Sequence, residues 1–529
     1  MSQLSRRHLI AAGLTPLLFN ESFGAEAPRR GGQLIMGTTT DPSYLTGAVT
    51  TAGATHLVSA KIFDGLLTYD LDMKPRPRLA VAWAFAPDGR SLSFKLRPGV
   101  TWHDGKPFTS ADVVFSVLEV WKKYHSRGRS TFANVIAVDT PDPLTAIFRL
   151  SKPAPYLLSA MSSMEAQVVP KHIYAGTDIL SNPANSAPIG TGPFRFVEWK
   201  RGQYIALERN PNYWDKGKPY LDRVIFRLLS NSDAHATSLE TGEIQLTYDA
   251  VPVYDLPRLI AGGRFLLDKA DYACMSNGSG LEFNLDRPAL KDVRVRRAIA
   301  HAIDINFIIK NIWQGYATPT ISAIPSNQKN FFTPDVPLYP YDLKKAASLL
   351  DQAGLKPGAN GVRLTVNLDP TPSVGPQIRV SEYIRNALGA IGIRVNLRSQ
   401  DFPTFVRRIY TDRDFDLNIS GGQMGPDPVI GTQRFYWSKN FQKGIAFSNG
   451  AHYNSAAADG ALERAQSEMD PVKRRADYVQ FQRIAQTDLP RIPLFSRLPL
   501  ILHTRNLRRI TSGAEGIYGN FVEVYFLQS

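Results

Sequence analysis

The residues best suited to acid–base or nucleophilic chemistry in this sequence are nine histidines and one cysteine, Cys274. His103 and Asp104 stand next to each other, as the members of an acid–base pair could. They precede Gly105 and lie just before a predicted helix start, so we interpret them as a polar turn. Cys274 could be a nucleophile, but no matching histidine motif accompanies it. We interpret it as a buried structural cysteine.

The sequence carries none of the motifs that commonly mark a catalytic or cofactor site. It lacks the Gly-x-Ser-x-Gly elbow, the phosphate-binding Gly-x-x-x-x-Gly-Lys loop, the dinucleotide motif Gly-x-Gly-x-x-Gly and the zinc motif His-Glu-x-x-His. A single cysteine excludes an intramolecular disulfide and argues against cysteine-ligated zinc or iron–sulfur sites. We therefore expect no enzyme activity, no metal and no cofactor. A secreted hydrolase is the alternative, and it would require a nucleophile–base pair.

The elements that would position a site are predicted from periodicity. Leu92, Phe94 and Leu96 alternate with polar residues, which predicts a half-buried strand. Thr109 and Asp112 have the spacing of a capping box that starts a helix. Between about 285 and 420, strand and helix patterns alternate, which predicts right-handed crossovers and a mostly parallel sheet. Without a long linker or tandem repeat, the chain is expected to pass between its domains more than once.

Length and charge limit the classes of function. The chain has 529 residues, enough for two to four domains of about 100–200 residues each. Its 61 basic and 47 acidic residues give a net charge of +14, which is typical of some nucleic-acid-binding proteins. The basic residues are dispersed, however, and the densest groups lie on predicted helices among acidic residues. We therefore expect no nucleic-acid partner.

Residues 1–27 have the layout of a removable export signal: a basic start, a short apolar stretch and small residues. Ser5-Arg6-Arg7, followed by Leu9-Ile10, is similar to the twin-arginine signal. An ordinary secretion signal that contains Arg-Arg is the alternative. Either signal predicts a mature protein that is soluble and extracytoplasmic, most simply periplasmic.

Several ordered blocks along the chain carry a family resemblance. They are Ile62-Phe-Asp-Gly-Leu-Leu67, Phe94-Lys-Leu-Arg-Pro-Gly-Val100, Trp102-His-Asp-Gly-Lys-Pro-Phe108, Pro188-Ile-Gly-Thr-Gly-Pro-Phe194, Arg209-Asn-Pro-Asn-Tyr-Trp214, Asp292-Val-Arg-Val-Arg-Arg-Ala-Ile299 and the stretch from Ala346 to Gly354. Together they resemble the signature of the family 5 extracellular solute-binding proteins, the peptide- and oligopeptide-binding components of ABC importers. The resemblance covers essentially the whole mature chain.

The resemblance implies an α/β fold with two lobes joined by a hinge, which is the type II periplasmic-binding-protein fold of the large cluster with an extra subdomain. It implies a first lobe from 28–56, 188–283 and 505–529, an extra subdomain from 57–187 and a second lobe from 284–504. The implied function is a periplasmic receptor, expected to be a monomer. It captures peptides or peptide-like solutes between closing lobes and delivers them to the membrane permease of an ABC importer.

The resemblance also indicates where the ligand binds. In peptide-binding relatives, an aspartate in the loop after the strand equivalent to 416–420 pairs with the ligand's amino terminus. Here Gln423 stands at about that position, and its side chain carries no charge. The other candidate ligand-binding residues are Thr51, Gly53, Gly421, Gly422, Met424, Asp427, Arg434 and Trp437. Structural alternatives stay open for several of them. Prolines flank Asp427, which could simply shape the loop, the two glycines could make a turn, and Trp437 could belong to the core.

Because a glutamine replaces the aspartate, unmodified peptides are one of several expected ligands. Opines, glycoconjugates, modified peptides and metal chelates are the alternatives within the same transport role. A binding protein without transport, such as a chaperone or a partner of a chemosensory receptor, is a further alternative class.

Overall fold

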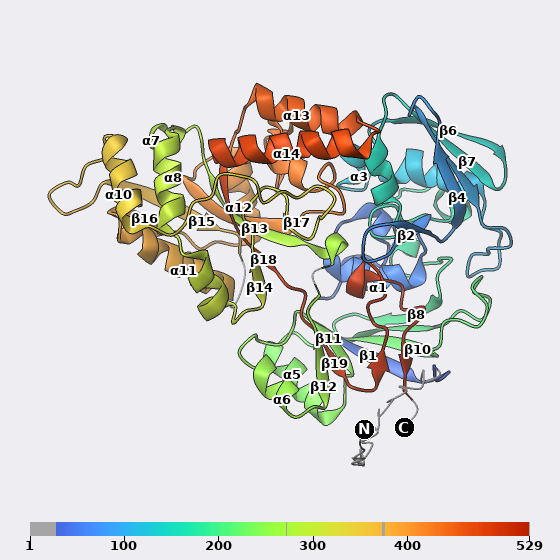
Figure 1. Ribbon diagram of the computed structural model, residues 1–529. Coiled ribbons are helices and arrows are strands. Elements are labelled where there is room, and N and C mark those ends of the chain that lie inside the picture. The colour runs from blue at the N-terminus through green and yellow to red at the C-terminus, as the bar shows by residue number, and fades with distance from the viewer. Residues whose placement is uncertain (1–27, 271, 373–375, 528–529) are drawn as a thin grey trace, which may run out of the picture.

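The computed structural model describes residues 28–270, 272–372 and 376–527. The predicted export signal, residues 1–27, lies outside this range. Figure 1 shows an elongated molecule in which the four-stranded sheet of β4 to β7 and helices α10 and α11 lie at opposite ends. Within the described residues, no helix combines the length and the apolar character that crossing a membrane requires.

The first lobe is built on a seven-stranded sheet. Its order is β12 (Phe265–Asp268), β19 (Ile501–Thr504), β11 (Leu246–Tyr248), β1 (Gln33–Thr38), β10 (Arg223–Leu228), β9 (Tyr204–Arg209) and β8 (Phe194–Lys200). β1 runs parallel to both β10 and β11, while the outer pairs are antiparallel. Leu34 and Met36 of β1 are fully buried, as a central strand of a covered sheet requires.

The second lobe is built on a six-stranded sheet. Its order is β14 (Ala317–Pro319), β18 (Arg491–Arg497), β13 (Asn277–Phe283), β17 (Leu417–Gln423), β15 (Leu364–Pro370) and β16 (Ile393–Leu397). The predicted crossover strands β17, β15 and β16 are parallel. The prediction of a mostly parallel sheet was wrong, because β13, β18 and β14 pair antiparallel. The chain enters this lobe along β13 and leaves it along the adjacent β18, so these two strands run in opposite directions.

A third sheet, of order β4 (Ala80–Phe85), β5 (Ser91–Leu96), β7 (Thr145–Leu150) and β6 (Val135–Asp142), lies within the range expected for the extra subdomain. The predicted capping box is present: the backbone N–H of Thr109 donates to the Asp112 carboxylate at 2.9 Å and starts α2 (Ser110–Phe115). Two short ribbons complete the strands, β2 (Leu67–Tyr69) with β3 (Pro75–Pro77) and β20 (Leu507–Arg508) with β21 (Tyr525–Phe526).

The remaining helices cover these sheets. They are α1 (Gly53–Ile62), α3 (Gly128–Thr131), α4 (Lys171–Tyr174), α5 (Ser232–Thr241), α6 (Leu256–Ala261), α7 (Pro288–Lys291), α8 (Val293–Ala302), α9 (Ile305–Phe307), α10 (Leu343–Gln352), α11 (Pro376–Gly389), α12 (Phe402–Val406), α13 (Ala456–Ser467) and α14 (Pro471–Asp488). Asp470 caps α14 by accepting from the backbone N–H of Val472 at 2.8 Å.

Two chain segments connect the two large sheets. Residues 269–276 lead from β12 to β13, and residues 498–500 lead from β18 back to β19. β13 therefore lies in the second sheet, although the boundary expected at 283 placed it in the first lobe. β19 lies in the first sheet, although the boundary expected at 504 placed it in the second lobe. One apolar core joins the first sheet to the four-stranded sheet, and a second core extends from helices α5 and α6 of the first lobe into the second lobe. Motion of the second lobe relative to the first would turn about the two connecting segments.

Candidate functional site: a cleft between the lobes

A cavity of about 880 Å³ lies where the two large sheets face each other across the connecting segments. The first lobe contributes Asn231, Asp249 and Tyr254, and the second lobe contributes Ser279, Trp313 and Gly421. Leu498 and Leu500 of the second connecting segment also line it. A smaller cavity of about 160 Å³ shares Asp249 and extends along the first lobe to Gly53. Both lobes therefore contribute walls to the larger cavity, at the strand ends where α/β folds bind ligands, and the smaller cavity adjoins it at Asp249.

Asp249 follows the end of β11 and places a carboxyl group in the wall of the larger cavity. Burial raises the pKa of its carboxyl, and Arg497, with Nη2 at 4.0 Å from Oδ2, opposes that rise. Its Oδ1 accepts from the backbone N–H of Leu500 at 2.9 Å. The carboxylate thus ties the first lobe to the connecting segment that must bend on opening.

Gly53 and Gly421 are two predicted residues that line the cleft. A Cβ at Gly53 would lie 2.9 Å from the Tyr518 hydroxyl, and Tyr518 packs edge-on against Tyr248. A Cβ at Gly421 would lie 2.7 Å from the carbonyl oxygen of Gly278 on the neighbouring strand. Glycine is needed at both positions because a side chain would collide with the cleft wall.

A second group of predicted residues gathers where the extra subdomain meets the second lobe. Arg127, just before α3, donates from Nη1 to the Gln423 side-chain oxygen at 3.3 Å. Arg434 donates from Nη2 to the Gln423 backbone oxygen at 3.2 Å. A Cβ at Gly422 would lie 2.7 Å from the same Nη2, so the glycine makes room for the guanidinium. Gln423 therefore lies between two arginines, one from the extra subdomain and one from the second lobe.

The other guanidinium groups around this point have partners. Glu165 binds Arg127 through two contacts, Oε1 with Nη2 at 2.5 Å and Oε2 with Nε at 3.2 Å. Arg491 donates to the Ser420 hydroxyl at 3.1 Å and to the Ser420 carbonyl oxygen. Burial raises the pKa of Glu165, and the Arg127 charge opposes that rise.

The structure places Asp427, one of the ligand-binding candidates, in an ion pair within the protein. Its side chain is fully buried and forms a two-pronged ion pair with Arg474, at 2.8 and 2.9 Å. One of its oxygens also accepts from the backbone N–H of Val429 at 3.0 Å. The carboxylate fixes the loop against α14, which is the loop-shaping alternative.

Three further candidates lie beside the cleft in contacts with the protein itself. Met424 is buried in the core under α13 and α14. Trp437 donates from its indole N–H to Glu463 at 2.9 Å. Thr51 shares a hydrogen bond with Ser126, their hydroxyl oxygens 3.2 Å apart, so it links the first lobe to the loop that carries Arg127.

Sequence reasoning missed Arg127, Asp249 and Arg497. Arg127 lies 296 residues from Gln423 in the chain, and its basic loop carries no pattern that distinguishes it from a solvated turn. Asp249 directly follows β11 and Arg497 is the last residue of β18, and strand ends were the only signal available for them.

The acid–base and nucleophile candidates are engaged elsewhere. The ring nitrogens of His103 lie 3.0 Å from the carbonyl oxygen of Gly192 and 3.2 Å from the backbone nitrogen of Gly190, while Asp104 pairs with His172 at 2.7 Å. Cys274 is buried, which raises the pKa of its thiol well above the ordinary value. Among residues 28–270, 272–372 and 376–527, no group of three or more His, Cys, Asp or Glu side chains is placed to hold a metal ion.

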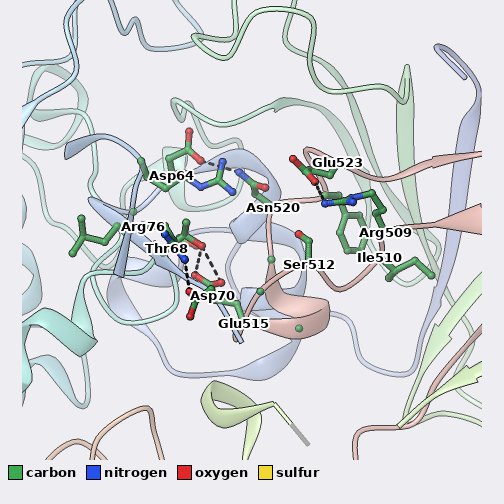
Figure 2. A pocket seen from close by; sticks show the side chains of 18 residues that line it. Asp64, Thr68, Asp70, Arg76, Arg509, Ile510, Ser512, Glu515, Asn520 and Glu523 are labelled. Carbon is green, nitrogen blue, oxygen red and sulfur yellow. Dashed lines mark hydrogen bonds and ion pairs between the residues drawn. The ribbon is translucent and has the colours of Figure 1, made fainter. Parts of the chain in front are cut away.

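A separate polar pocket of about 320 Å³ lies between the start of the extra subdomain and the C-terminal segment (Figure 2). Asp64 accepts from Asn520 at 3.0 Å and from the Trp214 indole at 2.9 Å. Thr68 donates to Glu515 at 2.9 Å. The Thr68–Glu515 and Asp64–Asn520 contacts, which join the extra subdomain to the C-terminal segment, are drawn in Figure 2. These bonds hold the end of the chain to the extra subdomain. None of the predicted binding residues lines this pocket.

Comparison with known proteins agrees with this architecture. Residues 74–444 match the family model of the bacterial extracellular solute-binding proteins, family 5. An ABC transporter peptide-binding protein of Brucella ovis is 32% identical over 456 residues, which are 83% of this chain and 82% of that protein.

Two solved structures show the same fold with different ligands. The oligopeptide-binding protein AppA of Bacillus subtilis, in complex with a nonapeptide, superposes with a TM-score of 0.80 at 25% identity, covering 95% of this chain and 100% of AppA. AgaA of A. tumefaciens R10, in complex with agropinic acid, superposes with a TM-score of 0.77 at 25% identity, covering 94% of this chain and 99% of AgaA.

Proposed function

The chain belongs to the family 5 bacterial extracellular solute-binding proteins, and from that premise we propose that it is the receptor that supplies an ABC importer with peptides or peptide-like solutes. The observation that carries the proposal is the cavity of about 880 Å³ whose walls come from both lobes. A solute in this cavity contacts both lobes only when they are closed. It therefore stabilises the closed state by its differential affinity, and no bond is made or broken.

The lobes of this receptor follow the sheets. The first lobe comprises 28–56, 188–268 and 501–527, the extra subdomain comprises 57–187, and the second lobe comprises 277–497. The two connecting segments, 269–276 and 498–500, form the hinge. This division is supported by the strand pairing, because the two large sheets share no strand.

The receptor acts in the periplasm as a monomer, and its leader is a twin-arginine signal. The Arg6-Arg7 pair and the family's extracellular members support this location. The closed, loaded form is the one that the permease of the importer accepts. The named ligands of relatives, a nonapeptide for AppA and agropinic acid for AgaA, support a peptide or a peptide-sized acidic solute.

Native mass spectrometry of the protein purified from its own periplasm tests the proposal. We expect one equivalent of a small solute, which denaturation releases and which raises the melting temperature of the stripped protein when added back. A protein that carries no solute and is stabilised by none of the periplasmic small molecules would overturn the proposal. Conversion of the solute during incubation would support the hydrolase alternative.

A further inference from the structure

We call Arg127, Gln423, Arg434 and Arg491 the interlobe cluster. Among the described residues, Arg127 pairs with Glu165, and Arg491 has no carboxylate within 4.0 Å but donates to the hydroxyl and the carbonyl oxygen of Ser420. Arg434 is the guanidinium of this cluster that has neither a carboxylate nor a side-chain acceptor among the described residues.

Among the described residues, no carboxylate lies within 4.0 Å of Arg434. Its Nε is buried and has no hydrogen-bond partner in that part of the chain. Its one protein acceptor is the Gln423 backbone oxygen, and its other close neighbour is the ring of Phe435, at 4.7 Å from the guanidinium carbon to the ring centroid.

The surroundings of Arg434 make an unpaired positive charge there unfavourable. Burial, followed by the charge of Arg127, lowers the pKa of Arg434 to about 10. Glu165 is already used by Arg127 in a two-pronged ion pair. Burial raises the pKa of Glu282, the next carboxyl, which accepts from Asn418 at 2.7 Å. A buried charge left in this state costs several kcal/mol, an order-of-magnitude figure, unless a partner supplies the opposite charge.

Within the receptor function proposed above, on which this inference rests, we propose that Arg434 binds a carboxylate of the transported solute. The backbone and side chain of Gln423 place this subsite between Arg434 and Arg127. A guanidinium offers the fork of donors that a carboxylate accepts. The ligand class is therefore an acidic solute that presents its carboxylate, and no ammonium group, to Arg434 beside Gln423.

The subsite also couples binding to closure. Arg127 belongs to the extra subdomain and Arg434 to the second lobe, so closing brings two guanidinium groups to the same glutamine. Glu165 already compensates Arg127, so the charge left unpaired in the empty closed state is that of Arg434. A solute carboxylate that pairs with Arg434 removes this cost and favours closure, which is the differential interaction that a closing receptor requires.

A titration with the smallest carboxylate tests the subsite. The melting temperature of the stripped, full mature protein is measured in increasing sodium acetate, with sodium chloride holding the ionic strength constant. Acetamide serves as the neutral isostere. We expect a saturable rise with acetate and none with acetamide, and Arg434→Gln should weaken the apparent acetate affinity by about tenfold or more. Arg407→Gln, which removes the same charge from the exposed surface of the same lobe, should leave the acetate response unchanged.

Three outcomes would overturn the inference. Acetate could change the melting temperature of the wild-type protein no more than chloride does, and this result can be observed without any variant. The acetate response could persist in Arg434→Gln. Inorganic phosphate could stabilise the protein saturably while acetate does not, which would assign a phosphate rather than a carboxylate. If the protein ignores acetate yet is stabilised by its co-purified solute, the anion subsite fails while the receptor function stands.

Discussion

Two polar regions of this protein bury charged groups, and they differ in how completely those groups are paired. In the pocket of Figure 2, the buried Asp64 receives hydrogen bonds from Trp214 and Asn520, and the buried Glu515 accepts from Thr68 at 2.9 Å. In the interlobe cluster, Arg434 has no carboxylate partner among the described residues, and its Nε is buried without an acceptor there.

This difference in pairing distinguishes residues that stabilise the fold from residues that we expect to bind a ligand. A buried group that the protein itself satisfies contributes to the unique fold, whereas one left open is stabilised only when a ligand arrives. The same contrast holds within one loop: Asp427 and Arg474 satisfy each other, while Arg434, seven positions further on than Asp427, has no such partner.

The largest expected effect concerns the buried ion pair between Asp427 and Arg474. Asp427→Ala removes one partner of a fully buried ion pair and leaves Arg474 uncompensated. We expect the free energy of unfolding to fall by about 3–5 kcal/mol, measured by denaturant titration. In the double variant Asp427→Ala/Arg474→Met, part of this loss should be recovered. A loss below about 1 kcal/mol in the single variant would show that the pair is not a structural element.

The next effect concerns pH near the interlobe cluster. Burial, together with Arg127, lowers the pKa of His56 to about 3. The unfolded chain takes up a proton below a pKa of about 6.5 while the folded protein does not, so stability falls as the pH falls from there toward 3. Between pH 7 and pH 5 this histidine should cost about 2 kcal/mol of unfolding free energy. His56→Gln should flatten that slope, and an unchanged slope would contradict the assignment.

A smaller effect is expected in the pocket of Figure 2. Asn520→Ala removes one donor from Asp64. We expect a loss of about 1 kcal/mol in unfolding free energy, with no change in the dissociation constant of the co-purified solute. Isothermal titration calorimetry supplies that second measurement. Weaker solute binding would show that this pocket belongs to the site and not only to the scaffold.

The smallest effect is expected at Gln423. Gln423→Ala keeps the backbone acceptor of Arg434 and removes the side-chain contact with Arg127. We expect stability to change by less than about 0.5 kcal/mol and the dissociation constant of the solute to rise about two- to tenfold. An unaltered dissociation constant would remove this side chain from the binding site.

Local patterns predicted much of the fold. The half-buried strand expected around Leu92, Phe94 and Leu96 is β5, and the capping box at Thr109 starts α2 as expected. β13 was not recognised because its sequence, Asn-Gly-Ser-Gly-Leu-Glu-Phe, contains two glycines and lacks strict alternation. The resemblance placed the residues of β19 within the second lobe, 284–504, because the partners that pair it with the first sheet, β11 and β12, lie more than 200 residues away in the chain.

The candidate site was predicted less completely than the fold. The loop at 421–434 was located through resemblance, but a sequence cannot show which of its charges find partners. Asp427 and Arg434 look equally available in the sequence, and only the position of Arg474 on α14 distinguishes them. Arg127 comes from a distant segment and reaches Gln423 only through the packing of the extra subdomain against the second lobe.

Small-angle X-ray scattering tests the central claim most directly. The radius of gyration of the stripped protein is compared with that of the same protein saturated with its co-purified solute. Closure about the segments 269–276 and 498–500 predicts a smaller radius for the loaded protein. An unchanged radius at saturation, with binding verified by calorimetry on the same sample, would contradict a receptor that works by closing its lobes.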